Sequence, residues 1–299
     1  MNIFLNAISR YSERNTTPKP GRERFSMGCM IVCALLSSQL AAVSAVNVVD
    51  SGGIFKQFDF SGTADGSVTD STQTLNVTGG DMLIVMTSVL VETTGVIDGN
   101  TTMNFGSAAM TRLHDISSAD GETVTSIFYL LNPAVGEGTL SITWDVDPTS
   151  TVPANSSFTT MSLLTLSNVN LDNPFGSMGT NANLSTGITL DSVEEGNLAL
   201  YVVGASGGLG NPPVDINGAT AVDYDGYVPL NRSERAGSHG LGVGAIAQDT
   251  GDLTISHPQT GRTAVAAAVE INTIPEPSAM TFIVIGVSGF LFRRRSVKG

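Results

Sequence analysis

A Gly-x-Ser-x-Gly pattern at residues 204–208 comes nearest, in this chain, to a catalytic motif. Ser206 would be the nucleophile, and an aspartate followed by His239 completes the Ser, Asp, His order of hydrolases that use the pattern. The serine needs a helix directly after it, because that helix positions the hydroxyl and supplies oxyanion donors. Residues 209–213 read Leu-Gly-Asn-Pro-Pro, which is typical of a turn. We therefore interpret the pattern as a glycine-rich strand end and expect no catalytic residue and no enzymatic activity.

The longest stretch without regular hydrophobic periodicity, residues 207–240, contains the side chains best suited to bind a ligand. Tyr224 and Tyr227 are aromatic residues with polar tips that could stack on sugar rings. Asp223 and Asp225 present alternating carboxylates, the ligands that calcium prefers. They lack the full spaced loop with a terminal glutamate, so a calcium site is one interpretation and a solvated acidic turn is the other. We expect no other cofactor.

The charge of the chain is concentrated in its middle part. Residues 46–274 contain five Lys and Arg residues against 24 Asp and Glu residues, a formal net charge of −19. Such a surface repels phosphate backbones, so we expect no binding to nucleic acid. High solubility outside the cell is the simplest consequence of this charge.

Both cysteines precede residue 46, so the middle part of the chain contains none. A cysteine nucleophile and cysteine-based metal sites are therefore excluded there. A domain of this length can bury enough surface to fold without disulfides.

Short runs rich in Val, Ile, Thr, Leu and Phe alternate with clusters of Gly, Asp, Asn, Ser and Pro throughout this middle part. Residues 140–144 show the alternation of apolar and polar side chains that is typical of a half-buried strand. The pattern predicts one all-β domain over residues 46–274, with two antiparallel sheets packed as a jelly-roll or immunoglobulin-like sandwich. The expected strands are residues 54–60, 72–78, 82–91, 109–113, 124–131, 139–144, 158–166, 198–205, 241–247, 253–256 and 263–271.

Four segments between Leu83 and Trp144 also resemble an extracellular β-sandwich module of exported bacterial proteins. These segments are Leu83–Val85, Phe105–Leu113, Ile127–Pro133 and Gly138–Trp144. The resemblance implies a sandwich fold and says little about activity, because such motifs consist mainly of strand and turn residues.

The N-terminal 45 residues have the order of an export signal. Five Lys and Arg residues precede an apolar run at residues 27–42, and small residues follow at Val43, Ser44 and Ala45. We predict a signal peptide over residues 1–45, with its apolar run as a helix and cleavage after Ala45.

The C-terminal 25 residues have a second membrane-related pattern. They consist of the triplet Pro275, Glu276 and Pro277, the apolar run 278–292, and the basic end 293–298 with Arg293, Arg294 and Arg295. Fifteen residues are fewer than the roughly 20 of an average membrane helix, so length alone leaves a buried helix or strand as an alternative. The arginines follow the apolar run without a turn residue, which favours a short transmembrane helix whose basic end stays in the cytoplasm.

This tail over residues 275–298 resembles a PEP-CTERM sorting signal. The resemblance implies export in an exopolysaccharide-producing Gram-negative bacterium and processing by an exosortase-like membrane protease. It also implies a transient inner-membrane anchor followed by residence at the cell surface or outside the cell. The resulting hypothesis is a non-enzymatic surface or matrix protein, associated with exopolysaccharide. A carbohydrate-binding module and a hydrolase of extracellular polysaccharides or esters are the alternatives.

Overall fold

The computed structural model describes most of the middle part of the chain. The described ranges are residues 45–58, 67–91, 101–118, 121, 123–145, 157–183, 187–206, 214–217, 219–220, 227–235, 239–247, 251–256 and 264–275. Contacts between Cα atoms group Ser44–Glu276 into one compact unit. Residues 1–44 of the predicted signal peptide, the apolar run 278–292 and the basic end 293–298 lie outside the described ranges. Those ranges contain no helix long and apolar enough to cross a membrane.

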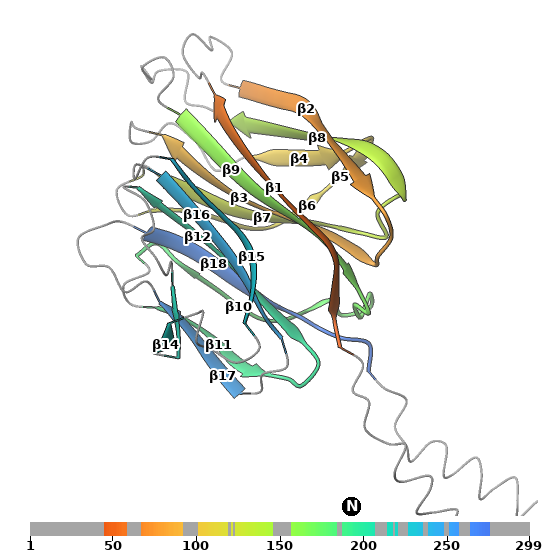
Figure 1. Ribbon diagram of the computed structural model, residues 1–299, viewed down its shortest axis with the longest axis vertical. Coiled ribbons are helices and arrows are strands. Elements are labelled where there is room, and N and C mark those ends of the chain that lie inside the picture. Colours follow the sequence, from red (N-terminus) through yellow and green to blue (C-terminus); the bar gives the residue numbers. More distant parts are fainter. Residues whose placement is uncertain are drawn as a thin grey trace, which may run out of the picture. The chain divides into compact units, whose positions relative to one another are not determined.

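The first half of this unit is a sandwich of two antiparallel sheets (Figure 1). One sheet has the order β1-β9-β3-β7-β6 and the other the order β2-β8-β4-β5. The strands are β1 (Asn47–Phe58), β2 (Ser67–Val77), β3 (Met82–Val91), β4 (Thr102–Phe105), β5 (Ala108–Ala109), β6 (Thr111–Ser117), β7 (Thr123–Leu131), β8 (Gly136–Asp145) and β9 (Ser157–Ser167). Their facing side chains form a core with large members such as Trp144, Phe128 and Phe105.

The second half is another sandwich, with sheets in the order β10-β18-β12-β16-β15 and β11-β17-β13-β14. Its strands are β10 (Phe175–Asn181), β11 (Ile188–Val193), β12 (Leu198–Ser206), β13 (Asp215–Ile216), β14 (Ala219–Thr220), β15 (Tyr227–Arg235), β16 (His239–Ala247), β17 (Gly251–Ser256) and β18 (Ala264–Ile271). Its core is built mainly from alanine and aliphatic side chains around Tyr201.

The two halves have the same topology, because adding nine to each strand number of the first half gives the strand order of the second. The registers agree as well. Leu166 pairs with Met82 on β3, and Ile271 pairs with Leu198 on β12. The bulges that interrupt the β6–β7 and β15–β16 pairs also occupy equivalent positions. The chain is therefore a tandem structural repeat.

The two halves pack through equivalent sheets, those of β3 and β12. One buried cluster joins Met82 and Ile84 of β3 to their counterparts Leu198 and Leu200 of β12. Equivalent surfaces that meet each other define an isologous contact, the type found in two-fold symmetric dimers. Ser88 and its counterpart Gly204 meet here, because a Cβ atom on Gly204 would collide with the Ser88 Oγ.

The segments that follow the last strand of each half also pair with each other. Val169 forms an antiparallel bridge with Thr273, and the Ile274 amide donates a hydrogen bond to the Asn168 carbonyl at 3.1 Å. Leu166 is equivalent to Ile271, because they pair with the equivalent residues Met82 and Leu198. Two and three residues further along, Asn168 and Val169 are therefore equivalent to Thr273 and Ile274. This bridge therefore repeats the two-fold relation of the packed sheets.

The prediction of an all-β fold with antiparallel sheets is confirmed for the described part of the chain. The prediction of two sheets is wrong, because the described strands form four. The irregular region expected at residues 207–240 also contains the strands β13, β14 and β15. β15 lies at a sheet edge, where Pro229 is tolerated because a missing backbone donor there breaks no ladder.

Candidate functional site

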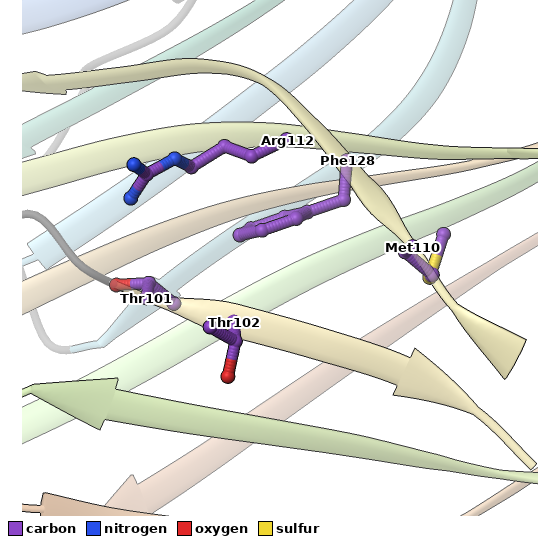
Figure 2. Close-up of a pocket in the computed structure, with 5 residues that line it drawn as sticks. All are labelled: Thr101, Thr102, Met110, Arg112 and Phe128. Carbon is purple, nitrogen blue, oxygen red and sulfur yellow. The ribbon is translucent and has the colours of Figure 1, made fainter. Parts of the chain in front are cut away.

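The described side chains form a pocket where the first sandwich opens at one edge. The chain leaves the sheet of β4 after Ala109 and joins the sheet of β7 at Thr111. Next to this crossing lies a cavity of about 280 Å³, shown in Figure 2. It is lined by Thr101, Thr102, Met110, Arg112 and Phe128. This volume lies just below the range of about 300–1,000 Å³ that is typical of ligand pockets, so the cavity could hold only a small molecule.

A β-bulge brings Arg112, the charged residue that lines this pocket, together with Asp115. Arg112 is opposite Phe128 and His114 is opposite Ile127, so Leu113 is the extra residue on β6. In a regular strand, residues three apart point to opposite faces, and one extra residue reverses this rule. Arg112 and Asp115 consequently meet, with 2.9 Å between Nη1 of the guanidinium and Oδ2 of the carboxylate.

Asp115 is the buried partner of this ion pair. Its side chain is 10% exposed, against 36% for Arg112, and its Oδ1 accepts a hydrogen bond of 2.7 Å from the Ser126 hydroxyl. Burial raises the pKa of Asp115, and the contacts with Ser126 and Arg112 oppose that rise. The carboxylate thus holds the guanidinium of a residue that lines the pocket.

His114, between Leu113 and Asp115, is a separate, half-buried group. Burial lowers the pKa of its imidazole, and its Nε2 has no hydrogen-bond partner within the described part of the chain. It lies opposite Ile127, whose side chain belongs to the cluster between the two sandwiches, whereas Asp115 lies opposite Ser126. We therefore assign His114 to the interface between the halves and not to the pocket.

Thr101 is the polar group of the pocket that most needs a partner. The residue is 3% exposed, and its hydroxyl has no hydrogen-bond partner among the residues that the structure describes. A buried hydroxyl without a partner costs about 1–3 kcal/mol. In Figure 2 the side chains of Thr101 and Arg112 lie on either side of the Phe128 ring. The lining thus combines a hydroxyl and a guanidinium with the apolar groups of Phe128 and Met110.

The second sandwich repeats the backbone of this site without its chemistry. The register places Pro229 at the position of Arg112, and Arg232 at the position of Asp115. Glycines occupy the positions of Ser126 and Phe128, at residues 242 and 244. Only the first half therefore has the residues for the Arg112–Asp115 ion pair.

The residues predicted to direct export lie at the ends of the described chain. Ala45, the predicted cleavage position, is partly buried, and Pro275 is exposed. Glu276, Pro277 and the three arginines 293–295 lie outside the described residues. Their predicted roles stay predictions.

The predicted ligand residues mostly lie outside the described ranges as well. Asp223, Tyr224 and Asp225 are among these, and Tyr227 is the first residue of β15. Among the residues that the structure describes, no group of three or more His, Cys, Asp or Glu side chains could hold a metal ion. Calcium binding at Asp223 and Asp225 stays a prediction.

The structure does bring together two residues of the rejected hydrolase pattern. Ser206, the last residue of β12, is paired with His239, the first residue of β16, in the antiparallel register. The serine thus ends a strand within a sheet, as the sequence pattern indicates.

Sequence reasoning missed the pocket residues. Arg112 and Asp115 are three apart in a segment expected to be a regular strand, so their meeting depends on a bulge that composition does not show. The available signal was the rarity of basic residues, since Arg112 is one of only five in residues 46–274. A basic residue in an apolar strand of an acidic domain has many carboxylates available to pair with, and Arg112 pairs with Asp115.

No family model matches this sequence, and no curated protein matches it. A solved structure of the infectious bursal disease virus Gx strain is similar at 14% identity and a TM-score of 0.23, covering 81% of this chain and 48% of the viral chain. A VP2 subviral particle of the same virus shows 14% identity and a TM-score of 0.23, covering 82% and 49%. This chain spans about half the length of those viral chains, and a similarity this low assigns no function.

Proposed function

We propose that this protein is an exported, non-enzymatic surface or matrix protein, whose mature part is the tandem β-sandwich. The signal peptide over residues 1–45 would direct export. An exosortase-like protease would process the tail that begins at Pro275, in a pathway associated with exopolysaccharide. Each half would be a jelly roll, since strand orders 1-9-3-7 and 2-8-4-5 fit an eight-stranded jelly roll in which β5 and β6 count as one strand.

The positions at which the folded unit begins and ends are the observation that supports this proposal. Contacts group Ser44–Glu276 together, β1 begins at Asn47, and the last bridge involves Thr273. Removal of the predicted signal peptide after Ala45 and of the tail from Pro275 would therefore leave every described strand in place. A protein with this acidic surface would also stay soluble in a matrix.

Fractionation of cells that produce tail variants tests the sorting step. We expect replacement of Pro275, Glu276 and Pro277 by alanine, or of the arginines 293–295 by serine, to keep the unprocessed chain in the membrane fraction. Lys56→Ser in the folded part is a control for loss of positive charge. Normal processing and release of both tail variants would contradict the proposed sorting.

Carbohydrate binding is the second candidate, and the pocket of the first sandwich favours it. The ligand would be one neutral sugar unit, because the pocket is small and the net charge of −19 repels anions. Sugar hydroxyls would satisfy the buried Thr101 hydroxyl, and the apolar groups of Met110 and Phe128 would contact C–H groups of the ring. This site differs from the one predicted at Tyr224 and Tyr227.

Saturation-transfer NMR with neutral monosaccharides and uronic acids tests this candidate. We expect Thr101→Val to weaken the binding of a neutral sugar about tenfold, because the variant keeps the shape and loses the hydroxyl. Thr189→Val, at an exposed position of the second sandwich, should leave binding unchanged. Equal binding by both variants, or stronger binding of uronic acids, would contradict the assignment.

A further inference from the structure

The bond predicted to be cut by signal peptidase is built into the folded domain. Val46 is 5% exposed and belongs to the cluster between the two sandwiches. Its amide donates a hydrogen bond of 3.0 Å to the Gly196 carbonyl. The Ala45 carbonyl, on the other side of the bond, accepts hydrogen bonds from the side chains of Asn47 at 2.9 Å and Asn168 at 3.1 Å. Both groups of the peptide bond are therefore engaged.

Pro275, the first residue of the C-terminal processing motif, has a different environment. The Thr273 amide donates to Asn197 Oδ1 at 2.8 Å, and the Ile274 amide donates to the Asn168 carbonyl at 3.1 Å. The next residue, Pro275, is exposed and has no amide hydrogen to donate. The chain is thus held through Ile274, and the motif begins where this hold ends.

Asn168 connects the two ends. Its side chain holds Ala45 and its carbonyl holds Ile274, so both predicted processing positions lie near one residue. Its φ of 63° is in the left-handed region, where asparagine is tolerated better than most residues. Asn168, at the end of the first sandwich, thereby holds both the segment that enters the folded unit at Ala45 and the segment that leaves it at Ile274.

We infer that folding seals the Ala45–Val46 bond and leaves Pro275 exposed, so that signal cleavage precedes folding and tail processing follows it. A protease must bind its substrate in an extended, accessible form, and cleavage of a folded segment is limited by the population of its open state. The chain would consequently cross the membrane unfolded. The exosortase-like protease would then act on a folded domain. This inference rests on the proposed export function.

An order-of-addition experiment on the full-length precursor tests the inference. The precursor is diluted from denaturant into detergent, with a purified bacterial signal peptidase present either during folding or only after it. We expect cleavage after Ala45 to be at least about tenfold slower when folding comes first. Equal rates in the two orders would overturn the inference and leave the proposed export intact. Absence of cleavage in both would overturn the predicted signal peptide and the inference together.

Asn168→Gly tests the role of the seal itself. Glycine keeps the left-handed backbone and removes the amide that binds Ala45. We expect the folded variant precursor to be cleaved about fivefold faster than the folded wild type, the effect of one lost hydrogen bond. Asn132→Gly is the matched control, because Asn132 also has a positive φ of 50° and its change should leave the rate unaltered. Equal rates for both variants would contradict a seal through Asn168.

Discussion

The two sandwiches of this chain share a backbone plan and differ in how they fill it. In the first, Val85 on β3 is paired with Phe128 on β7; in the second, the equivalent pair is Tyr201 and Gly244. The aromatic ring has thus changed strands between the repeats, and a small residue faces it in each. The comparison shows that strand order and register are common to the repeats, whereas each half fills its core with different side chains.

Chemistry differs between the halves more than packing does. The bulge on the edge strand occurs in both, but only the first half uses it to join Arg112 and Asp115 beside a pocket. The second half instead has a buried carboxylate, Glu270, at the position of Thr165. A duplicated scaffold can therefore carry a candidate ligand site on one copy and a structural polar network on the other.

The largest expected effect comes from removing either aromatic ring. Phe128→Ala and Tyr201→Ala should each lower the free energy of unfolding by about 3–5 kcal/mol, because each leaves a cavity in a buried core. Denaturant unfolding followed by circular dichroism measures the loss. Since the halves share a buried interface, we expect one cooperative transition in both variants. Two separate unfolding transitions would contradict this expectation and show that the halves unfold independently.

The next effect concerns the polar network of the second half. Glu270 is 3% exposed and accepts hydrogen bonds from the Ser177 and Glu194 amides and the Asn197 side chain, at 2.8, 2.9 and 2.7 Å. Glu270→Gln replaces an acceptor by a donor, so we expect a loss of about 2–3 kcal/mol in unfolding free energy. Glu195→Gln, at an exposed neighbour, should change it by less than about 0.5 kcal/mol. Similar values for the two variants would mean that the network contributes nothing.

A third test addresses the contact between equivalent residues. Gly204→Ser makes this position identical to its counterpart Ser88, and we expect it to lower stability by about 1–3 kcal/mol through overpacking. Adding Ser88→Gly moves the hydroxyl to the other half and should restore part of the loss, because Thr125 and Thr123 still lie close to the new Cβ atom. The double-mutant cycle by urea unfolding gives the coupling. Additive losses would contradict the two-fold contact.

The smallest effect is the pH dependence that arises from Asp115. Its pKa is raised in the folded protein, so between its ordinary and raised values the folded state binds more protons than the unfolded chain. Stability contributed by this group therefore falls as pH rises through that window. Subtracting the stability curve of Asp115→Asn from that of the wild type isolates the slope, because other groups cancel. A difference curve that rises with pH there would contradict the burial of Asp115.

The sequence predicted strands such as 82–91 and 124–131, because short runs rich in Val, Ile, Leu and Phe between turn residues are typical of buried strands. It did not predict β10, which reads Phe-Gly-Ser-Met-Gly-Thr-Asn and is stabilised by pairing with β18. Pairing of that kind depends on a partner about 90 residues away. Local composition cannot show it.

The repeat itself was visible only faintly. Residues 138–144 read Gly-Thr-Leu-Ser-Ile-Thr-Trp and residues 251–257 read Gly-Asp-Leu-Thr-Ile-Ser-His, which share a pattern and few identities. The sequence therefore predicts two sheets, whereas the described strands form four. The pocket was missed for a related reason, since a single extra residue at Leu113 decides which side chains meet.

The central claim, that the tandem sandwich is the exported and processed product, is tested most directly by the termini of the chain at the cell surface. Intact-mass and N-terminal sequence analysis of the protein from the surface fraction gives both ends. The proposal predicts a chain that begins at Val46 and lacks the apolar run 278–292. A chain that retains residues 1–45 and the complete tail, recovered from the cytoplasm, would contradict it.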